Sequence, residues 1–162
     1  MSTRCNVLLK DGHEQLWFYR HSDGYPSVTG ESLRRFMRWV IDGRLRDNVS
    51  QAGGWLILLG AVEYQTLSAT LFPQGTIESY KQDRNAVADA VRAFVPNDWK
   101  CGAYEPTCGQ HRHIEFLYTI DLESKSMTCA SVRGFDEKAK PIVVATVDRS
   151  NIDQPLPAPV RD

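Results

Sequence analysis

The chain has 162 residues and a formal net charge of −1, with 42% hydrophobic and 24% charged residues. This length suits one domain with a sizeable core, and the composition is typical of a soluble globular protein. A net charge this small gives no whole-molecule attraction for nucleic acid, so any affinity for anions must come from a local patch.

Targeting and redox features favour a cytoplasmic protein. The longest apolar run, residues 53–62, is too short to span a bilayer, and the N-terminal residues lack the apolar core of a signal peptide. Four cysteines are present, without a paired CxxC spacing: Cys5, Cys101, Cys108 and Cys129. We therefore expect free thiols rather than disulfides.

The pattern of residues 4–20 predicts a β-hairpin with a two-residue turn at residues 11 and 12, which pairs Lys10 with His13. In this register four side chains share the face that should meet the core: Cys5, Val7, Leu16 and Phe18. The opposite face carries two aromatic side chains, which either lie under a second layer or line a site: Trp17 and Tyr19.

The run WFYRHSDGYP, residues 17–26, connects this hairpin to the first helix. Four of its side chains bind charge or move protons: Arg20, His21, Asp23 and Tyr25. Such a density at a strand-to-loop junction is typical of functional sites. It also suits a tight turn, because Asp23 and Gly24 favour the bend and Pro26 stiffens the exit. If the run is catalytic, His21 would act as a general base and Asp23 would orient it.

An amphipathic helix is predicted from Thr29 or Gly30 to about Ile41, with Gly43 as its stop signal. Its apolar stripe follows the spacing i, i+3, i+4, i+7, i+8: Leu33, Phe36, Met37, Val40 and Ile41.

Arginines dominate the polar positions in and just after this helix: Arg34, Arg35, Arg38, Arg44 and Arg46. The only acid between residues 34 and 46 is Asp42, so the local charge is +4. Arginine binds phosphates and carboxylates bidentately through its planar fork. The set is therefore either a solvated helix face or, with Arg20 and Tyr25, a surface for an anionic partner.

Residues 51–64 are apolar nearly all round and predict a buried helix capped by Ser50. Glycines lower the helix propensity, so a central strand is the alternative. Gly53 and Gly60 are seven residues apart and would mark one face in close contact with a neighbour. A third helix is expected over residues 83–95.

Strand patterns dominate from residue 99 onward: residues 99–104, 113–122, 127–132 and 141–147. We expect a single α+β domain over residues 1–150, followed by an extended proline-rich tail over residues 151–162. The domain would hold an antiparallel sheet, formed by the N-terminal hairpin and the C-terminal strands, with two or three helices packed on one face.

His111, His113 and Glu115 form a weak metal candidate. If a strand begins this early, alternation places all three on one face, as a three-ligand set. Their spacing matches no standard zinc motif, and the same alternation would point them at solvent or a partner. No P-loop, GxSxG, HExxH or GxGxxG motif is present, which disfavours the common enzyme classes, and no cofactor is expected.

Four runs carry a resemblance: YRHSDGYP (19–26), NVSQAGGW (48–55), WKCGAYEPT (99–107) and IEFLYTIDL (114–122). Through them the chain resembles short uncharacterised proteins of phages, prophages and other mobile elements. The resemblance implies a small cytosolic accessory protein of a mobile element, and it transfers no catalytic residue. Many such proteins bind a host molecule rather than turn over a substrate.

The leading hypothesis is a non-enzymatic protein that binds an anionic host partner, which would be a defence protein, a nucleic acid or a nucleotide signal. The first alternative is a small hydrolase or nuclease that uses His21 and Asp23, with or without a metal. The second alternative is a structural protein that self-assembles through the aromatic face of the sheet, as a homo-oligomer.

Overall fold

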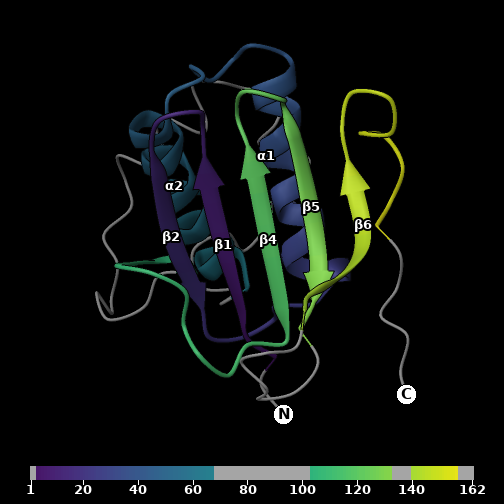
Figure 1. Cartoon of the computed structure of the whole chain (residues 1–162). Coiled ribbons are helices and arrows are strands. Elements are labelled where there is room, and N and C mark those ends of the chain that lie inside the picture. Colours follow the sequence, from purple (N-terminus) through teal and green to yellow (C-terminus); the bar gives the residue numbers. More distant parts are fainter. Residues whose placement is uncertain (1–2, 68–102, 133–139, 157–162) are drawn as a thin grey trace.

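A computed structural model describes residues 3–67, 103–132 and 140–156. These residues form one six-stranded sheet in the order β3-β2-β1-β4-β5-β6, and both α-helices lie behind it in Figure 1. The strands are β1 (Cys5–Lys10), β2 (Gln15–Arg20), β3 (Glu105–Thr107), β4 (Phe116–Asp121), β5 (Ser126–Ser131) and β6 (Ile142–Val147). The predicted α+β domain with helices on one face is confirmed. The helix expected over residues 83–95 lies outside the described residues.

The sheet is mixed rather than purely antiparallel as predicted. All neighbouring strands are antiparallel except β1 and β4, which are parallel in the centre of the sheet. Parallel neighbours need a long crossover connection, and here the chain between β2 and β4 contains both α-helices. Residues 103 and 104 are not in a strand, and β3 follows them directly, so the strand predicted over 99–104 is wrong in its described part.

The β1–β2 hairpin has a longer loop than predicted, because Lys10 pairs with Gln15 instead of His13. The Asp11 carboxylate sets this loop, since its Oδ1 accepts hydrogen bonds from the backbone N–H groups of His13 and Glu14, each at 2.8 Å. The predicted register is wrong by two residues, and an even shift leaves every side chain on its predicted face. Three of the four predicted core side chains are buried: Cys5, Val7 and Phe18. The fourth, Leu16, is 37% exposed.

Helix α1 (Glu31–Ile41) follows a short π-helical segment, η1 (Pro26–Gly30). All five residues of the predicted apolar stripe are buried against the sheet, and this prediction is confirmed. The chain leaves the helix at Gly43, whose φ of 67° is the left-handed conformation that glycine adopts without strain.

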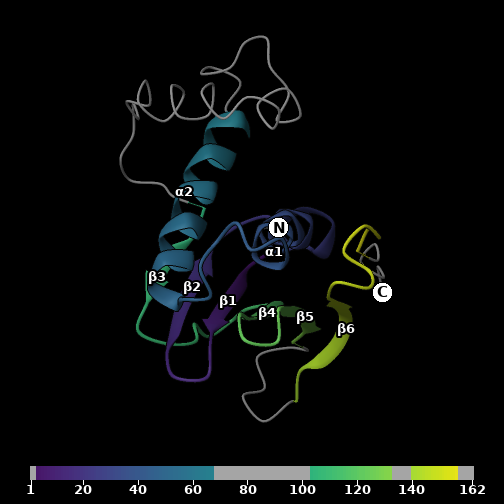
Figure 2. The ribbon, with the colours of Figure 1, turned by 90° about the horizontal axis from the view of Figure 1, so that it is seen from above.

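Helix α2 (Val49–Leu67) settles the choice between helix and strand over residues 51–64. Its cap is Asn48 rather than Ser50, because Asn48 Oδ1 accepts the Gln51 N–H at 3.0 Å. Figure 2 shows α2 meeting the sheet at its N-terminal end and running away from the sheet toward its C-terminal end. None of the helices formed by the described residues is long and apolar enough to cross a membrane.

Gly53 and Gly60 of α2 are close to neighbours, as predicted. A Cβ added at Gly53 would lie 2.8 Å from Leu16 Cδ1, and one added at Gly60 would lie 2.5 Å from Tyr104 Cδ2. Both distances are shorter than real carbon contacts, so glycine lets α2 approach β2 and the segment that precedes β3.

The core extends past residue 150, the expected end of the domain. Ile152 and Leu156 are buried, and the Leu156 N–H donates to Glu31 Oε1 at 2.7 Å. The segment predicted to be an extended tail therefore packs on α1 as far as Leu156, and residues 157–162 lie outside the described part of the chain.

Candidate functional site

Arg20, a predicted anion-binding residue, is buried in an internal polar cluster. Its side chain is 2% exposed, and Nη1 lies 2.8 Å from Glu63 Oε2. Its Nε donates to the Ser22 carbonyl at 2.8 Å, and the guanidinium lies 5.4 Å from the centroid of the Tyr104 ring. Burial alone would lower the pKa of Arg20, but Tyr104 and Glu63 raise it, so the guanidinium stays charged. These contacts join β2 to α2.

The turn at residues 22–25 is held by contacts from η1, from the residue before β1 and from β4. Asp23 adopts a φ of 60°, and its carbonyl accepts the Thr29 hydroxyl at 2.6 Å. The Gly24 carbonyl accepts the buried Tyr118 hydroxyl at 2.9 Å, and a Cβ at Gly24 would lie 2.9 Å from the Arg4 carbonyl carbon. These contacts support the structural role of the turn that the sequence suggested.

His21, a predicted catalytic candidate, lies in a cluster with Tyr19 and His111. The Tyr19 hydroxyl lies 3.2 Å from His21 Nδ1, and the Tyr19 ring stacks on His111 with centroids 4.2 Å apart. Desolvation raises the pKa of Tyr19, so its hydroxyl keeps its proton at neutral pH. Tyr19, which lies on the sheet face opposite the core, therefore contacts both His21 and His111. The sequence had placed these two histidines in separate candidate sites.

His111, His113 and Glu115 do not lie on one strand face. Strand β4 begins only at Phe116, and His113 has a φ of 63°, which breaks the expected alternation. Glu115 Oε2 instead accepts the Arg4 N–H at 2.7 Å. Within the described ranges, no three His, Cys, Asp or Glu side chains lie close enough together to hold a metal ion.

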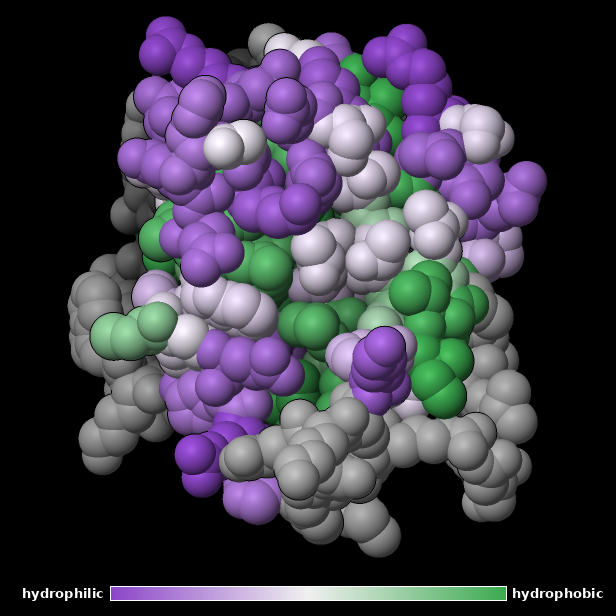
Figure 3. Space-filling view, in the orientation of Figure 1, coloured by the Kyte–Doolittle hydropathy of each residue, from purple (hydrophilic) through white to green (hydrophobic). Residues whose placement is uncertain are grey.

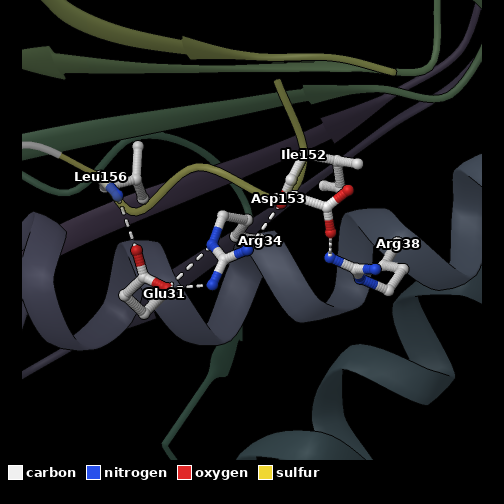
Figure 4. A network of polar contacts seen from close by, with 6 residues as sticks. All are labelled: Glu31, Arg34, Arg38, Ile152, Asp153 and Leu156. Carbon is white, nitrogen blue, oxygen red and sulfur yellow. Dashed lines mark hydrogen bonds and ion pairs between the residues drawn. The ribbon is translucent and has the colours of Figure 1, made fainter. Parts of the chain in front are cut away.

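Two of the predicted arginines bind the segment after β6 (Figure 4). Arg34 donates to Glu31 Oε2 at 2.6 and 2.8 Å and to the Ile152 carbonyl at 2.6 Å. Arg38 forms an ion pair with Asp153. Arg34 is therefore engaged within the fold, whereas the Arg38–Asp153 pair lies at the surface, with side chains 43% and 80% exposed. Ile152 and Asp153 lie more than 100 residues away along the chain, beyond the reach of a local pattern.

Glu31 is the centre of this network. Its Oε2 accepts Arg34 and its Oε1 accepts the Leu156 N–H (Figure 4). Partial burial alone would raise the pKa of Glu31, but the hydrogen bonds from Arg34 and Leu156 outweigh it, and the pKa is lowered. One carboxylate thus fastens the C-terminal segment to the first turn of α1.

Three predicted arginines remain for a partner: Arg35, Arg44 and Arg46. Arg44 Nε lies 3.8 Å from Asp42 Oδ2, but both side chains are exposed, at 61% and 44%, and such a pair contributes little. Within the described residues, neither Arg35 nor Arg46 has a carboxylate at ion-pair distance.

Helix α2 carries a second apolar stripe that sequence reasoning missed. The predicted all-round burial is wrong, since Trp55 is 49% and Ile57 is 43% exposed. The buried stripe is Val49, Ala52, Gly53, Leu56 and Gly60. The outer stripe has the spacing i, i+3, i+4, i+7 and is flanked by Trp55: Gly54, Ile57, Leu58 and Ala61. A Cβ at Gly54 would meet none of the described atoms within 4 Å, so no described segment covers this side of the helix.

The sheet face opposite the helices is uncharged at its centre. Trp17 and Tyr19 lie on this face, as predicted, and are half-buried. One row across the strands is Trp17, Leu8, Thr119, Thr128 and Thr146. Figure 3 shows this face as a pale and green band between purple regions, ending in a green group over β6. The face offers packing and hydroxyl contacts, without a concentration of charge.

No family model, curated protein or solved structure matches the chain.

Proposed function

We propose that this chain is a non-catalytic accessory protein of a phage or another mobile element that binds an acidic host protein, such as a defence protein. The partner packs on the outer stripe of α2, and its acidic groups face Arg44 and Arg46 beside the N-terminal end of that helix. The observation that carries the proposal is the half-exposed Trp55 next to Ile57 on a helix that is apolar on all sides.

An apolar helix surface of this kind favours a protein partner. Exposed apolar patches on soluble proteins mark interaction sites, and tryptophan is among the residues that contribute most to binding energy. The small residues Gly54 and Ala61 sit one heptad apart on the open side of α2, and they let another helix approach closely.

The charges support an acidic protein over a nucleic acid. Arg44 and Arg46 lie just before α2 begins at Val49, where the helix dipole adds partial positive charge. Asp42 and Asp47 lie in the same connection and formally balance the two arginine charges, although Asp47 also pairs with Lys125 at 3.4 Å. A nucleic acid needs several free cations along its phosphates, whereas these few arginines suit scattered carboxylates.

A small hydrolase is a second candidate, favoured by the cluster of Tyr19, His21 and His111. The hydroxyl of Tyr19 contacts His21 at 3.2 Å, so this cluster contains a pair able to pass a proton. Hydrolysis of ester and phosphodiester substrates by the wild type, lost on His21→Ala, would favour this candidate over the binding protein.

A pull-down from bacterial host lysate, quantified by mass spectrometry at rising salt, tests the binding proposal. We expect Trp55→Asp with Ile57→Asp to remove the retained protein, and the matched change Val28→Asp, at a residue 42% exposed, to keep it. Arg44→Glu with Arg46→Glu should weaken retention, while Lys140→Glu at the other edge of the molecule should not. A retained protein that survives the α2 changes would contradict the proposal.

A further inference from the structure

The two edges of the sheet differ in how they are protected. Strand β3 has only three residues and contains Pro106 and Glu105, features that prevent pairing with another strand. Strand β6 has six residues, IVVATV, without a charge or a proline. Three of its apolar side chains are exposed by 40–59%: Ile142, Val143 and Val144.

We propose that β6 pairs with β6 of a second copy of this chain, antiparallel, to form a continuous sheet across a two-fold axis. Exposed apolar edge strands present unpaired N–H and C=O groups that bind another strand. This surface lies at the opposite sheet edge from β2 and α2, so self-pairing leaves the surface of the proposed function open.

Charge complementarity specifies a second copy as the occupant and sets the register. Lys140 precedes β6 and Asp148 follows it. An antiparallel pair centred on Val144 places Lys140 of each copy opposite Asp148 of the other, so that both ends of the paired strands carry opposite charges. A parallel pair would instead place like charges side by side at both ends.

The bulge in β6 limits the strength of this contact. The β5–β6 register shifts between Cys129 and Ala130, which leaves Val144 as the extra residue on β6. A bulge interrupts the outer row of N–H and C=O groups, and the Thr146 carbonyl already accepts the Asn151 side-chain N–H at 2.8 Å, so each copy offers only short stretches for pairing. We therefore expect a weak, reversible dimer that forms with rising protein concentration.

Sedimentation velocity over a hundredfold range of concentration tests the proposal with the full chain. We expect reversible dimer formation by the wild type, loss of the dimer in Val143→Lys, and an unchanged dimer in the matched variant Val28→Lys. Both residues are exposed, by 59% and 42%, so the fold should persist, which circular dichroism and melting temperature will check. A wild type that stays monomeric, or a dimer that Val143→Lys leaves intact, would overturn the proposal.

The register has its own test. Lys140→Glu should raise the dimer dissociation constant several-fold, and adding Asp148→Asn should recover part of the loss, because asparagine keeps the turn contact with the Ser150 N–H without the charge. In a background with Cys101 and Cys108 replaced by serine, Val144→Cys should form a disulfide-linked dimer on oxidation, and Val28→Cys should not. Equal crosslinking from both positions would contradict the two-fold axis at Val144.

Discussion

Arg20 Nη1 and Glu63 Oε2 lie 2.8 Å apart in a buried ion pair that joins the end of β2 to α2. The pair joins β2 to the C-terminal half of α2, the helix that Figure 2 shows running away from the sheet. The arginine that the sequence assigned to anion binding thus positions the helix that presents the exposed Trp55.

Removing either member of this pair should destabilise the protein strongly. We expect Arg20→Met or Glu63→Leu to lower the free energy of unfolding by about 3–5 kcal/mol, because each leaves a charge buried without its partner. The double variant should lose less than the sum of the two single losses, since it removes both charges. Urea denaturation measures all three, and strictly additive losses would show that the pair does not act as a unit.

The two glycines on opposite sides of α2 should respond differently to alanine. Gly60→Ala would place a Cβ 2.5 Å from Tyr104 Cδ2, and we expect a loss of about 1–3 kcal/mol. Gly54→Ala meets open space, and the higher helix propensity of alanine should stabilise the protein by about 0.5–1 kcal/mol. Thermal melting of both variants checks the prediction. Equal changes in melting temperature for Gly60→Ala and Gly54→Ala would contradict the packing of Gly60 against Tyr104.

The lowered pKa of Glu31 makes part of the stability depend on pH. A carboxyl with a lower pKa in the folded state stabilises that state above its unfolded pKa, ordinarily 4.5, and the contribution is lost as the pH falls through the folded value. Glu31→Gln should therefore be about 1 kcal/mol less stable than the wild type at pH 7. The difference should shrink in acid below pH 4.5. The exposed variant Glu123→Gln is the control, and a Glu31→Gln difference that is independent of pH would contradict this account.

The thiols should differ sharply in reactivity. Burial raises the pKa of Cys5 to about 12 and that of Cys129 to about 11, whereas Cys108 is exposed. In a Cys101→Ser background, a disulfide reagent should label one thiol rapidly in the native protein and two more only after denaturation. Cys108→Ser should abolish the rapid phase. Rapid labelling of Cys5 or Cys129 would show that the core opens.

Local patterns predicted the parts of the fold that depend on neighbours along the chain. The apolar stripe of α1 is buried as its spacing predicted, because one apolar face of a helix is enough to show which side packs on the core. The side chains of the hairpin lie on their predicted faces although the predicted register is wrong, because the register differs by an even number of residues. The parallel pairing of β1 with β4 depends on a crossover that no local pattern encodes.

The candidate site was less predictable because its residues find distant partners. Arg34 and Arg38 had the pattern of a solvated or anion-binding face, yet they bind residues of the C-terminal segment. Tyr19 and His111 meet only after β2 and the loop before β4 lie side by side. The exposed stripe of α2 could not be predicted either. Because the helix is apolar on every side, its sequence does not indicate which side is exposed.

Site-specific photocrosslinking from α2 in bacterial host cells shows whether α2 is the binding surface. A benzophenone amino acid replaces Ile57 in one variant and Val28, at similar exposure, in the control. We expect a discrete crosslinked host protein from position 57, absent from position 28 and weakened by Arg44→Glu with Arg46→Glu. No crosslink from position 57, or the same products from both positions, would contradict the claim that α2 is the binding surface.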